Sequence, residues 1–291
     1  MVSHGSSSTR PASSYVVVML EKRSHLVRSK SVVGNSLYKY SGCDRIMEKN
    51  IKLKTKDSHI IYGALNTSDK KSDTLAVFVH GLTGHPNEHT FFNAAHQFPK
   101  KGIDVFRFSL YTGEKGGRKL SECTITTHAK DLDRVISYFR KKYQTIAIIG
   151  HSLGSPTILK SDFQKVDNII LWDPSHLTQG SKDTPKTAKL NGREVYIEEW
   201  GAEYLMNPKM TKEWLWFNGK NELDLVQQIS VPFKVITAGK GILKEGGRLY
   251  YKYANEPKDF AVIKGAGHTF DEEGAEEKLL SETLSWIRKY S

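Results

Sequence analysis

The sequence has few cysteines and no long apolar run. Its 291 residues include two cysteines, Cys43 and Cys123, which are too few for a disulfide framework and lie in no C-x-x-C or zinc-ligand spacing. The apolar run at 15–20 has six residues, whereas a helix needs about 20 to cross a bilayer. Basic residues follow this run, the reverse of their order in a secretion signal. We therefore expect no transmembrane segment, no secretion signal and a reducing, cytoplasmic location.

Signatures of cofactor binding are also missing from the sequence. It contains no phosphate loop, no dinucleotide-binding fingerprint and no metal-ligand spacing. Most of the formal net charge of +11 lies in residues 1–56, which hold eleven Lys or Arg and three acidic residues. In the rest of the chain the numbers of basic and acidic residues are nearly equal. We expect no cofactor and no metal, and no nucleic-acid partner for the catalytic part of the chain.

The stretch at 145–155, T-I-A-I-I-G-H-S-L-G-S, combines a strand, a tight turn and a helix start. Residues 145–149 form a β-branched apolar run typical of a strand buried on both faces, and 156–164 is typical of a helix. Between them, 150–154 matches the G-x-S-x-G nucleophile elbow. In this motif a strained backbone projects the Ser152 hydroxyl above the sheet, next to the helix N-terminus. Ser152 is therefore the candidate nucleophile.

Strand and helix patterns alternate through most of the chain. Strands are predicted at 75–79, 103–108, 145–149, 168–172, 233–238 and 259–263, and helices at 90–101, 126–142, 156–164, 246–254 and 272–289. This alternation predicts an α/β fold with a mostly parallel central sheet and helices on both faces. Upstream, alternating apolar positions predict a β-hairpin around a turn at 56–58. These positions are Ile51, Leu53, Ile60, Tyr62 and Ala64.

His268 has the position expected of a general base. It follows the last predicted strand and a short Gly-rich loop, and it precedes a helix. A base must reach the Ser152 hydroxyl, so its imidazole belongs on a loop at the carboxyl edge of the sheet. His80, His85 and His151 lie in Gly-rich turns and are interpreted as loop-shaping residues.

Three motifs occur in the order found in α/β hydrolases. They are Val77-Phe-Val-His-Gly81, Gly150-His-Ser-Leu-Gly154 and Gly265-Ala-Gly-His-Thr-Phe270. From Ile51 to its C-terminus the chain resembles this superfamily, and it looks most like the esterase, monoacylglycerol-lipase and serine-aminopeptidase-like branch. The resemblance implies an α/β-hydrolase fold with a small cap insertion.

An oxyanion hole follows from the elbow and the resemblance together. One amide comes from Leu153, the residue after the nucleophile, and the resemblance places the other at Leu82, directly after His80-Gly81. We expect these two N–H groups to hold the negative charge of a tetrahedral intermediate, an effect on the order of 3 kcal/mol per donor.

The acid of the expected triad departs from the family pattern. Related hydrolases usually carry an Asp shortly after the strand that corresponds to 233–238, where this chain offers only Glu245. Asp173 ends the predicted strand at 168–172, and some hydrolases of this fold, the haloalkane dehalogenases among them, take their acid from that strand end. Asp173 also keeps the chain order nucleophile, acid, base. A structural Asp-Pro turn is the alternative interpretation. Asp173 is the first candidate for the acid and Glu245 the second.

The chain is predicted to have three parts. Residues 1–48 form a basic, partly disordered N-terminal extension, residues 49–291 form the hydrolase domain, and residues 175–230 form a cap inserted into that domain. Large apolar side chains in the cap either line an acyl or aromatic pocket over Ser152 or dock the cap onto the domain. They are Trp200, Tyr204, Leu205, Met206, Trp214, Trp216 and Phe217.

Two functions are compatible with the sequence. The first is a serine hydrolase that cleaves small-molecule carboxylic esters with small or medium acyl groups, aromatic ones included, through an acyl-enzyme. The second is a catalytically impaired binding protein with the hydrolase fold, an interpretation that the missing Asp favours. The intact Ser152 and His268 favour the enzyme. Nothing in the sequence indicates the oligomeric state.

Overall fold

The computed structural model describes residues 45–176, 186–199, 203–217 and 220–291. Most of the predicted basic extension, residues 1–44, lies outside this range, and so does Trp200 of the predicted cap. Within the described ranges, no helix is both long and apolar enough to span a bilayer.

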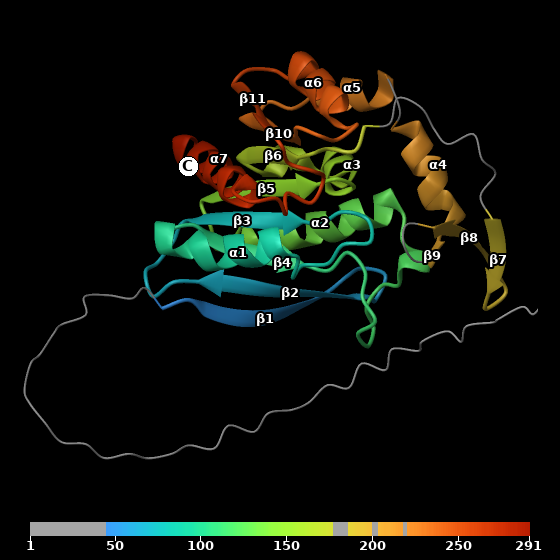
Figure 1. Cartoon of the computed structure of the whole chain (residues 1–291). Coiled ribbons are helices and arrows are strands. Elements are labelled where there is room, and N and C mark those ends of the chain that lie inside the picture. Colours follow the sequence, from blue (N-terminus) through green and yellow to red (C-terminus); the bar gives the residue numbers. More distant parts are fainter. Residues whose placement is uncertain (1–44, 177–185, 200–202, 218–219) are drawn as a thin grey trace, which may run out of the picture. The chain divides into compact units, whose positions relative to one another are not determined.

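An eight-stranded sheet forms the centre of the fold, and Figure 1 shows it edge to edge, from β1 at the bottom to β11 at the top. The spatial order of its strands is β1-β2-β4-β3-β5-β6-β10-β11. All pairs from β4 to β11 are parallel, whereas β2 pairs antiparallel with both β1 and β4, so only β2 runs against the other strands. The mostly parallel sheet is therefore confirmed. The strands are β1 (Met47–Lys54), β2 (Ile60–Thr67), β3 (Thr74–Val79), β4 (Asp104–Phe108), β5 (Thr145–His151), β6 (Asn168–Trp172), β10 (Phe233–Ala238) and β11 (Lys258–Ile263).

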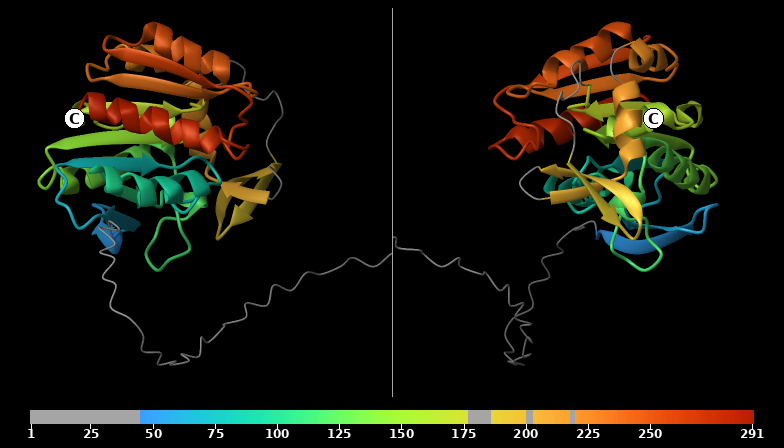
Figure 2. Two further views of the ribbon diagram at one scale, coloured as in Figure 1. Left: turned by 60° about the vertical axis from the view of Figure 1, so that its left-hand side comes forward. Right: turned by 90° about the vertical axis from the view of Figure 1, so that its right-hand side faces the viewer.

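Helices cover both faces of the sheet, as predicted. One apolar core joins α2, α3 and α6 to one face, and a second core joins α1 and α7 to the other. The left view of Figure 2 shows α1 and α7 side by side in front of the strands. Strand β3 contributes Leu75 and Val77 to the first core and Ala76 and Phe78 to the second, which explains its unbroken apolar run. The helices are α1 (His89–Gln97), α2 (Ile125–Phe139), α3 (Gly154–Lys160), α6 (Lys244–Tyr253) and α7 (Ala275–Lys289), with short 3-10 turns at Pro99–Lys101, Leu120–Glu122 and Phe163–Lys165.

The predicted hairpin is present, but the alternating positions named for its second strand lie on the face opposite to Ile51 and Leu53. Leu53 pairs with Ile61, and both side chains lie in the core. Residues directly opposite in an antiparallel pair share a face, so Ile60, Tyr62 and Ala64 lie on the other side of the sheet. A shift of one residue exchanges the two faces of a strand, and the adjacent Ile60 and Ile61 hide the true register from a pattern of alternation.

The segment predicted as a cap lies between β6 and β10. It consists of a three-stranded antiparallel sheet, followed by two helices. Glu213 accepts a hydrogen bond from the Thr126 amide at the start of α2 (2.8 Å), and Met206, Trp214 and Phe217 pack against the first core. These side chains dock the cap onto the domain, whereas Trp216 is 45% exposed. The cap elements are β7 (Lys186–Leu190), β8 (Arg193–Glu199), β9 (Glu203–Met206), α4 (Pro208–Trp216) and α5 (Lys220–Val226).

Candidate active site

Ser152 occupies a tight turn between β5 and α3. Its φ of 53° is in the left-handed region that few non-glycine residues adopt. The glycines on either side allow this turn because no side chain fits there. A Cβ on Gly154 would lie 2.3 Å from the Val79 carbonyl oxygen, and a Cβ on Gly150 would lie 2.5 Å from Ile158 Cδ1. This local geometry is the one expected for the G-x-S-x-G turn.

His268 and Asp173 meet at the carboxyl edge of the sheet. His268 Nδ1 lies 2.6 Å from Asp173 Oδ2. A carboxylate only accepts hydrogen bonds, so Nδ1 carries the ring proton and Nε2 keeps its lone pair. The other Asp173 oxygen accepts a hydrogen bond from the Ala238 amide (3.0 Å). Asp173 is fully buried, whereas the His268 side chain is 41% exposed. This arrangement orients the imidazole and leaves one ring nitrogen available as a base.

Glu245, the second candidate for the acid, lies elsewhere. It stands in the first turn of α6 with its side chain 71% exposed, and its carboxylate lies 3.6 Å from Arg248 Nε. Within the described ranges, Glu245 makes no hydrogen bond or ion pair with His268. The structure therefore brings Asp173 to the histidine and keeps Glu245 apart from it.

The hydroxyl of Ser152 forms a hydrogen bond with Ser175, a residue that we did not predict for the site. Ser152 Oγ lies 3.1 Å from Ser175 Oγ, and in the described part of the chain it makes no hydrogen bond with His268. Such catalytic hydrogen bonds are often long in enzymes without substrate. Ser175 follows Asp173-Pro174 directly, and that proximity is the only sequence signal that points to it.

Two histidines hold the loop that carries His268. His151 donates its Nε2–H to the His268 carbonyl (2.9 Å), and His89 lies with Nε2 3.0 Å from the Thr269 carbonyl. Burial, helped by repulsion from His268, lowers the pKa of His151 to about 3, so His151 stays neutral. Its predicted loop-shaping role agrees with this contact, and His89 is an addition from the structure.

The two predicted oxyanion amides belong to residues next to Ser152 or next to a residue that approaches it. Leu153 follows it in the chain, and Leu82 follows Gly81, where a Cβ would lie 3.1 Å from Ser152 Cβ. Neither the Leu82 nor the Leu153 amide donates a hydrogen bond to another described residue. Unpaired N–H groups beside a nucleophile are suited to an anionic oxygen.

His80 orients the peptide between Gly81 and Leu82. The Leu110 amide donates to His80 Nε2 (3.0 Å), so the ring proton is on Nδ1 and is donated to the Gly81 carbonyl oxygen (2.8 Å). The N–H of Leu82 belongs to the same planar peptide and points to the opposite side. Burial lowers the pKa of His80 to about 4 and keeps the ring neutral.

Solved structures of similar shape are esterases and other α/β hydrolases. The α/β hydrolase GrgF from Penicillium sp. sh18 has a TM-score of 0.68 at 16% identity, over 84% of this chain and 99% of that one. Est1E from Butyrivibrio proteoclasticus, with ferulic acid bound, has 0.67 at 14%, over 82% and 98%. The esterase domain of a Rhodothermus marinus protein has 0.61 at 17%, over 84% and 99%. This chain has the α/β-hydrolase fold. No protein-family model matches the chain, and no curated protein sequence matches it significantly.

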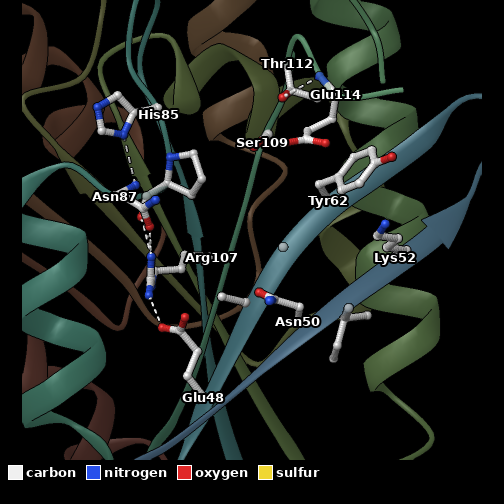
Figure 3. A pocket seen from close by; sticks show the side chains of 14 residues that line it. Glu48, Asn50, Lys52, Tyr62, His85, Asn87, Arg107, Ser109, Thr112 and Glu114 are labelled. Atoms are coloured by element: carbon white, nitrogen blue, oxygen red, sulfur yellow. Dashed lines mark hydrogen bonds and ion pairs between the residues drawn. The ribbon is translucent and has the colours of Figure 1, made fainter. Parts of the chain in front are cut away.

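A polar hollow of about 570 Å³ lies beside the hairpin of this α/β-hydrolase fold (Figure 3). Arg107, on β4, extends along it to Glu48 of β1 in one direction and to Asn87 in the other, and it also donates to the Pro86 carbonyl (3.2 Å). Pro86 and Asn87 belong to the loop that carries Leu82. Arg107 therefore ties the far end of that loop to the sheet.

Metal ligands do not gather at this site. Across the described ranges, no group of three or more His, Cys, Asp or Glu side chains is arranged to hold a metal ion. Cys123 is a buried free thiol, and burial raises its pKa, so it stays protonated.

Proposed function

We propose that this chain is a serine hydrolase that cleaves carboxylic esters through an acyl-enzyme. The observation that carries the proposal is the contact between Asp173 and His268 at the sheet edge where Ser152 adopts its strained turn. A nucleophile, a base and a buried carboxylate that orients the base are the three parts that this chemistry requires.

In the proposed acylation step, Ser152 Oγ attacks the ester carbonyl carbon. His268 Nε2 takes the hydroxyl proton as the C–O bond forms, and Asp173 stabilises the resulting imidazolium. The amides of Leu82 and Leu153 hold the negative charge on the carbonyl oxygen. His268 then gives the proton to the alcohol oxygen, the ester C–O bond breaks, and the acyl group stays on Ser152.

In deacylation, water takes the place of the alcohol. His268 removes a proton from the water molecule, whose oxygen attacks the acyl carbonyl, and the same two amides hold the second tetrahedral intermediate. His268 then gives the proton to Ser152 Oγ, the bond between Oγ and the acyl carbon breaks, and the carboxylic acid leaves. Because His268 is 41% exposed, water has access to the base.

For the substrate we propose esters with small or medium acyl groups, aromatic ones included. Est1E, one of the structures of similar shape, binds ferulic acid, which is an aromatic carboxylic acid. The cap offers Trp214 and the partly exposed Trp216 as apolar surface. A panel of p-nitrophenyl and hydroxycinnamoyl esters would rank these acyl groups by kcat/KM.

Covalent labelling tests the serine mechanism directly. A fluorophosphonate probe should label the native chain, and Ser152→Ala should abolish both labelling and ester hydrolysis, lowering turnover on the order of 10⁴-fold or more. Ser155→Ala is a matched control, since Ser155 is a buried hydroxyl of the adjacent helix. Labelling of Ser152→Ala to the native level would overturn the assignment.

A binding protein with this fold is the second candidate. The observation that favours it is the hydrogen bond of Ser152 Oγ to Ser175 instead of His268. A native chain that is folded, takes up no fluorophosphonate and hydrolyses no ester of the panel would support this alternative.

A further inference from the structure

Ser175 contacts the candidate nucleophile twice. Its hydroxyl lies 3.1 Å from Ser152 Oγ, and its backbone N–H donates to the Ser152 carbonyl (3.3 Å). Ser175 is only 6% exposed, so its side chain has little freedom of its own, and the position of its hydroxyl depends on the position of its backbone. A displacement of Ser175 would therefore displace a direct partner of Ser152.

Three buried side chains connect Ser175 to the cap. Tyr250 of α6 has its hydroxyl 3.0 Å from the Ser175 carbonyl oxygen and in contact with Glu222 Oε1 of α5. The other Glu222 oxygen contacts His176 Nδ1. The side chains of His176 and Glu222 are each 1% exposed, and Tyr250 is fully buried. A continuous row of polar atoms thus runs from the cap helix α5 to the residue beside Ser152.

The number of protons in this row decides which bonds form. The Tyr250 hydroxyl has one proton but faces two acceptors, the Ser175 carbonyl and Glu222 Oε1. If Glu222 is a neutral acid, its own proton goes to Tyr250, and Tyr250 donates to Ser175. If Glu222 is ionised, its carboxylate is a stronger acceptor than the neutral Ser175 carbonyl. Tyr250 then donates its proton to Glu222, and the Ser175 carbonyl loses its donor.

We propose that Glu222, in its neutral form, acts with Tyr250 as a positioning relay that holds Ser175, and through it the Ser152 hydroxyl, in the geometry for attack. This inference rests on the proposed serine-hydrolase function. Within the relay, His176 donates its Nδ1–H to Glu222 Oε2, Glu222 donates to Tyr250, Tyr250 donates to the Ser175 carbonyl, and Ser175 donates to Ser152 Oγ. Every proton then has one acceptor, and Ser152 keeps its own proton for His268.

The surroundings of Glu222 are consistent with a neutral acid. Burial raises its pKa to about 7, against the opposing effect of His176. His176 and Tyr250 are the ionisable groups that contact Glu222 from outside its helix in the described part of the chain. On its own helix, Lys220 and Asp224 pair with each other at the surface (2.5 Å). Glu222 therefore exchanges its proton in the pH range where enzymes are assayed.

The variant Glu222→Gln distinguishes the effect of Glu222 ionisation on kcat from other effects of pH. The glutamine amide is as long as the acid, stays neutral at every pH, donates to Tyr250 and accepts from His176. The full-length native chain and Glu222→Gln should have the same kcat near pH 5.5. Above about pH 7 the native kcat should fall below that of the variant by about 2- to 12-fold, the rate equivalent of one hydrogen bond. Any pH dependence that the two proteins share cancels in the ratio.

Two further variants test the remaining links of the relay. Tyr250→Phe removes the donor to Ser175, and Ser175→Ala removes the contact to Ser152. Near pH 5.5 each should lower kcat by about 2- to 12-fold with KM unchanged. Above about pH 7, where the native chain has lost the same hydrogen bond, each should approach the native kcat, so the ratio of each variant to native should change with pH. Asp224→Asn is the matched control on α5, because it removes an exposed carboxylate, and its ratio to native kcat should stay constant with pH. Thermal unfolding at each pH confirms that all variants are folded.

The outcomes separate the relay from the proposed function. If the native chain labels with fluorophosphonate and hydrolyses esters, but the ratio of native to Glu222→Gln kcat is constant from about pH 5.5 to 8.5, the relay alone is overturned. A rise in kcat for Ser175→Ala also overturns it, since Ser175 would then restrain Ser152 away from attack. If the native chain neither labels nor hydrolyses esters, the serine-hydrolase function fails and the relay fails with it.

Discussion

Asp173 Oδ2 lies 2.6 Å from His268 Nδ1, although the two residues are 95 positions apart in the sequence. Asp173 follows β6 directly and has a φ of 38°, another conformation that is rare outside glycine. Its backbone N–H donates to the Ile236 carbonyl (2.7 Å) and its Oδ1 accepts from Ala238, so two contacts to β10 hold the carboxylate in place. The strain at Asp173 is compatible with a residue whose orientation serves the site.

Substitution of Asp173 should remove most of the activity. In Asp173→Asn the amide can present its NH₂ to His268 Nδ1, which favours the wrong tautomer and provides no charge to stabilise the imidazolium. We expect kcat to fall by about 10⁴-fold with little change in KM, as measured by steady-state ester hydrolysis. Glu245→Gln is the control and should be nearly silent, since that carboxylate is 71% exposed and pairs with Arg248. The opposite pattern would transfer the role to Glu245.

The orientation of the Leu82 amide should depend on His80. His80→Leu removes the shortest hydrogen bond to the Gly81 carbonyl and leaves those from the Gly84 amide (3.3 Å) and the Tyr111 hydroxyl (3.4 Å), so the peptide that carries the Leu82 N–H is held less firmly. We expect kcat to fall by about 10- to 100-fold while KM changes little. His80→Asn retains an N–H donor of similar reach and should recover part of the loss. His85→Gln, in the exposed part of the same loop, should leave kcat unchanged, and an equal loss in that variant would contradict the specific role of His80.

Much of the fold was accessible from the sequence because its strands are buried on both faces. The segments at 145–149, 168–172 and 233–238 are short and mostly apolar, and all three are strands in the structure. The hairpin face was not accessible, because Ile60 and Ile61 are both apolar and the correct register depends on pairing with Leu53. Local pattern decides which segments are strands, whereas partner strands decide which side faces the core.

For the candidate site, the sequence indicates a residue where its type has to occur at a particular strand end. Ser152 and His268 follow from Gly-rich turns after strands. Asp173 was one of two alternatives, because the distance between a strand end and a loop 95 residues later is a tertiary quantity. Ser175 and Glu222 carry no motif, and only the packing of α5 and α6 against the loop after β6 brings them together.

Arg107 should stabilise the domain through the loop that it ties to the sheet. Its side chain is 2% exposed, whereas that of its partner Glu48 is 45% exposed. Arg107→Met leaves Asn87 and the Pro86 carbonyl without their donor, and we expect a loss of about 1–3 kcal/mol in the free energy of unfolding, measured in urea. Glu48→Gln should cost less than about 1 kcal/mol, because a half-exposed ion pair contributes little. Equal losses in the two variants would contradict the importance of the loop contacts.

His128 makes the native state sensitive to acid. It is fully buried, and neither ring nitrogen has a hydrogen-bond partner within the described residues. Burial lowers its pKa to about 3 from the ordinary 6.5, and His80 and Arg118 act in the same direction. Between these two pH values the unfolded chain binds a proton that the native chain does not. Stability therefore falls as the pH drops below about 6.5, by up to about 1.4 kcal/mol per pH unit from this residue.

His128→Phe should remove this sensitivity without destabilising the protein. The phenyl ring fills a similar volume and has no polar nitrogen to bury without a hydrogen bond. The free energy of unfolding near pH 7 should therefore be unchanged or about 1 kcal/mol higher. Urea unfolding between about pH 4.5 and 7.5 should show a shallower loss of stability in the variant than in the native chain. His85→Gln, which replaces an exposed histidine, should leave the slope unchanged. A variant that is less stable near pH 7, or that keeps the native slope, would show that the His128 nitrogens have partners after all.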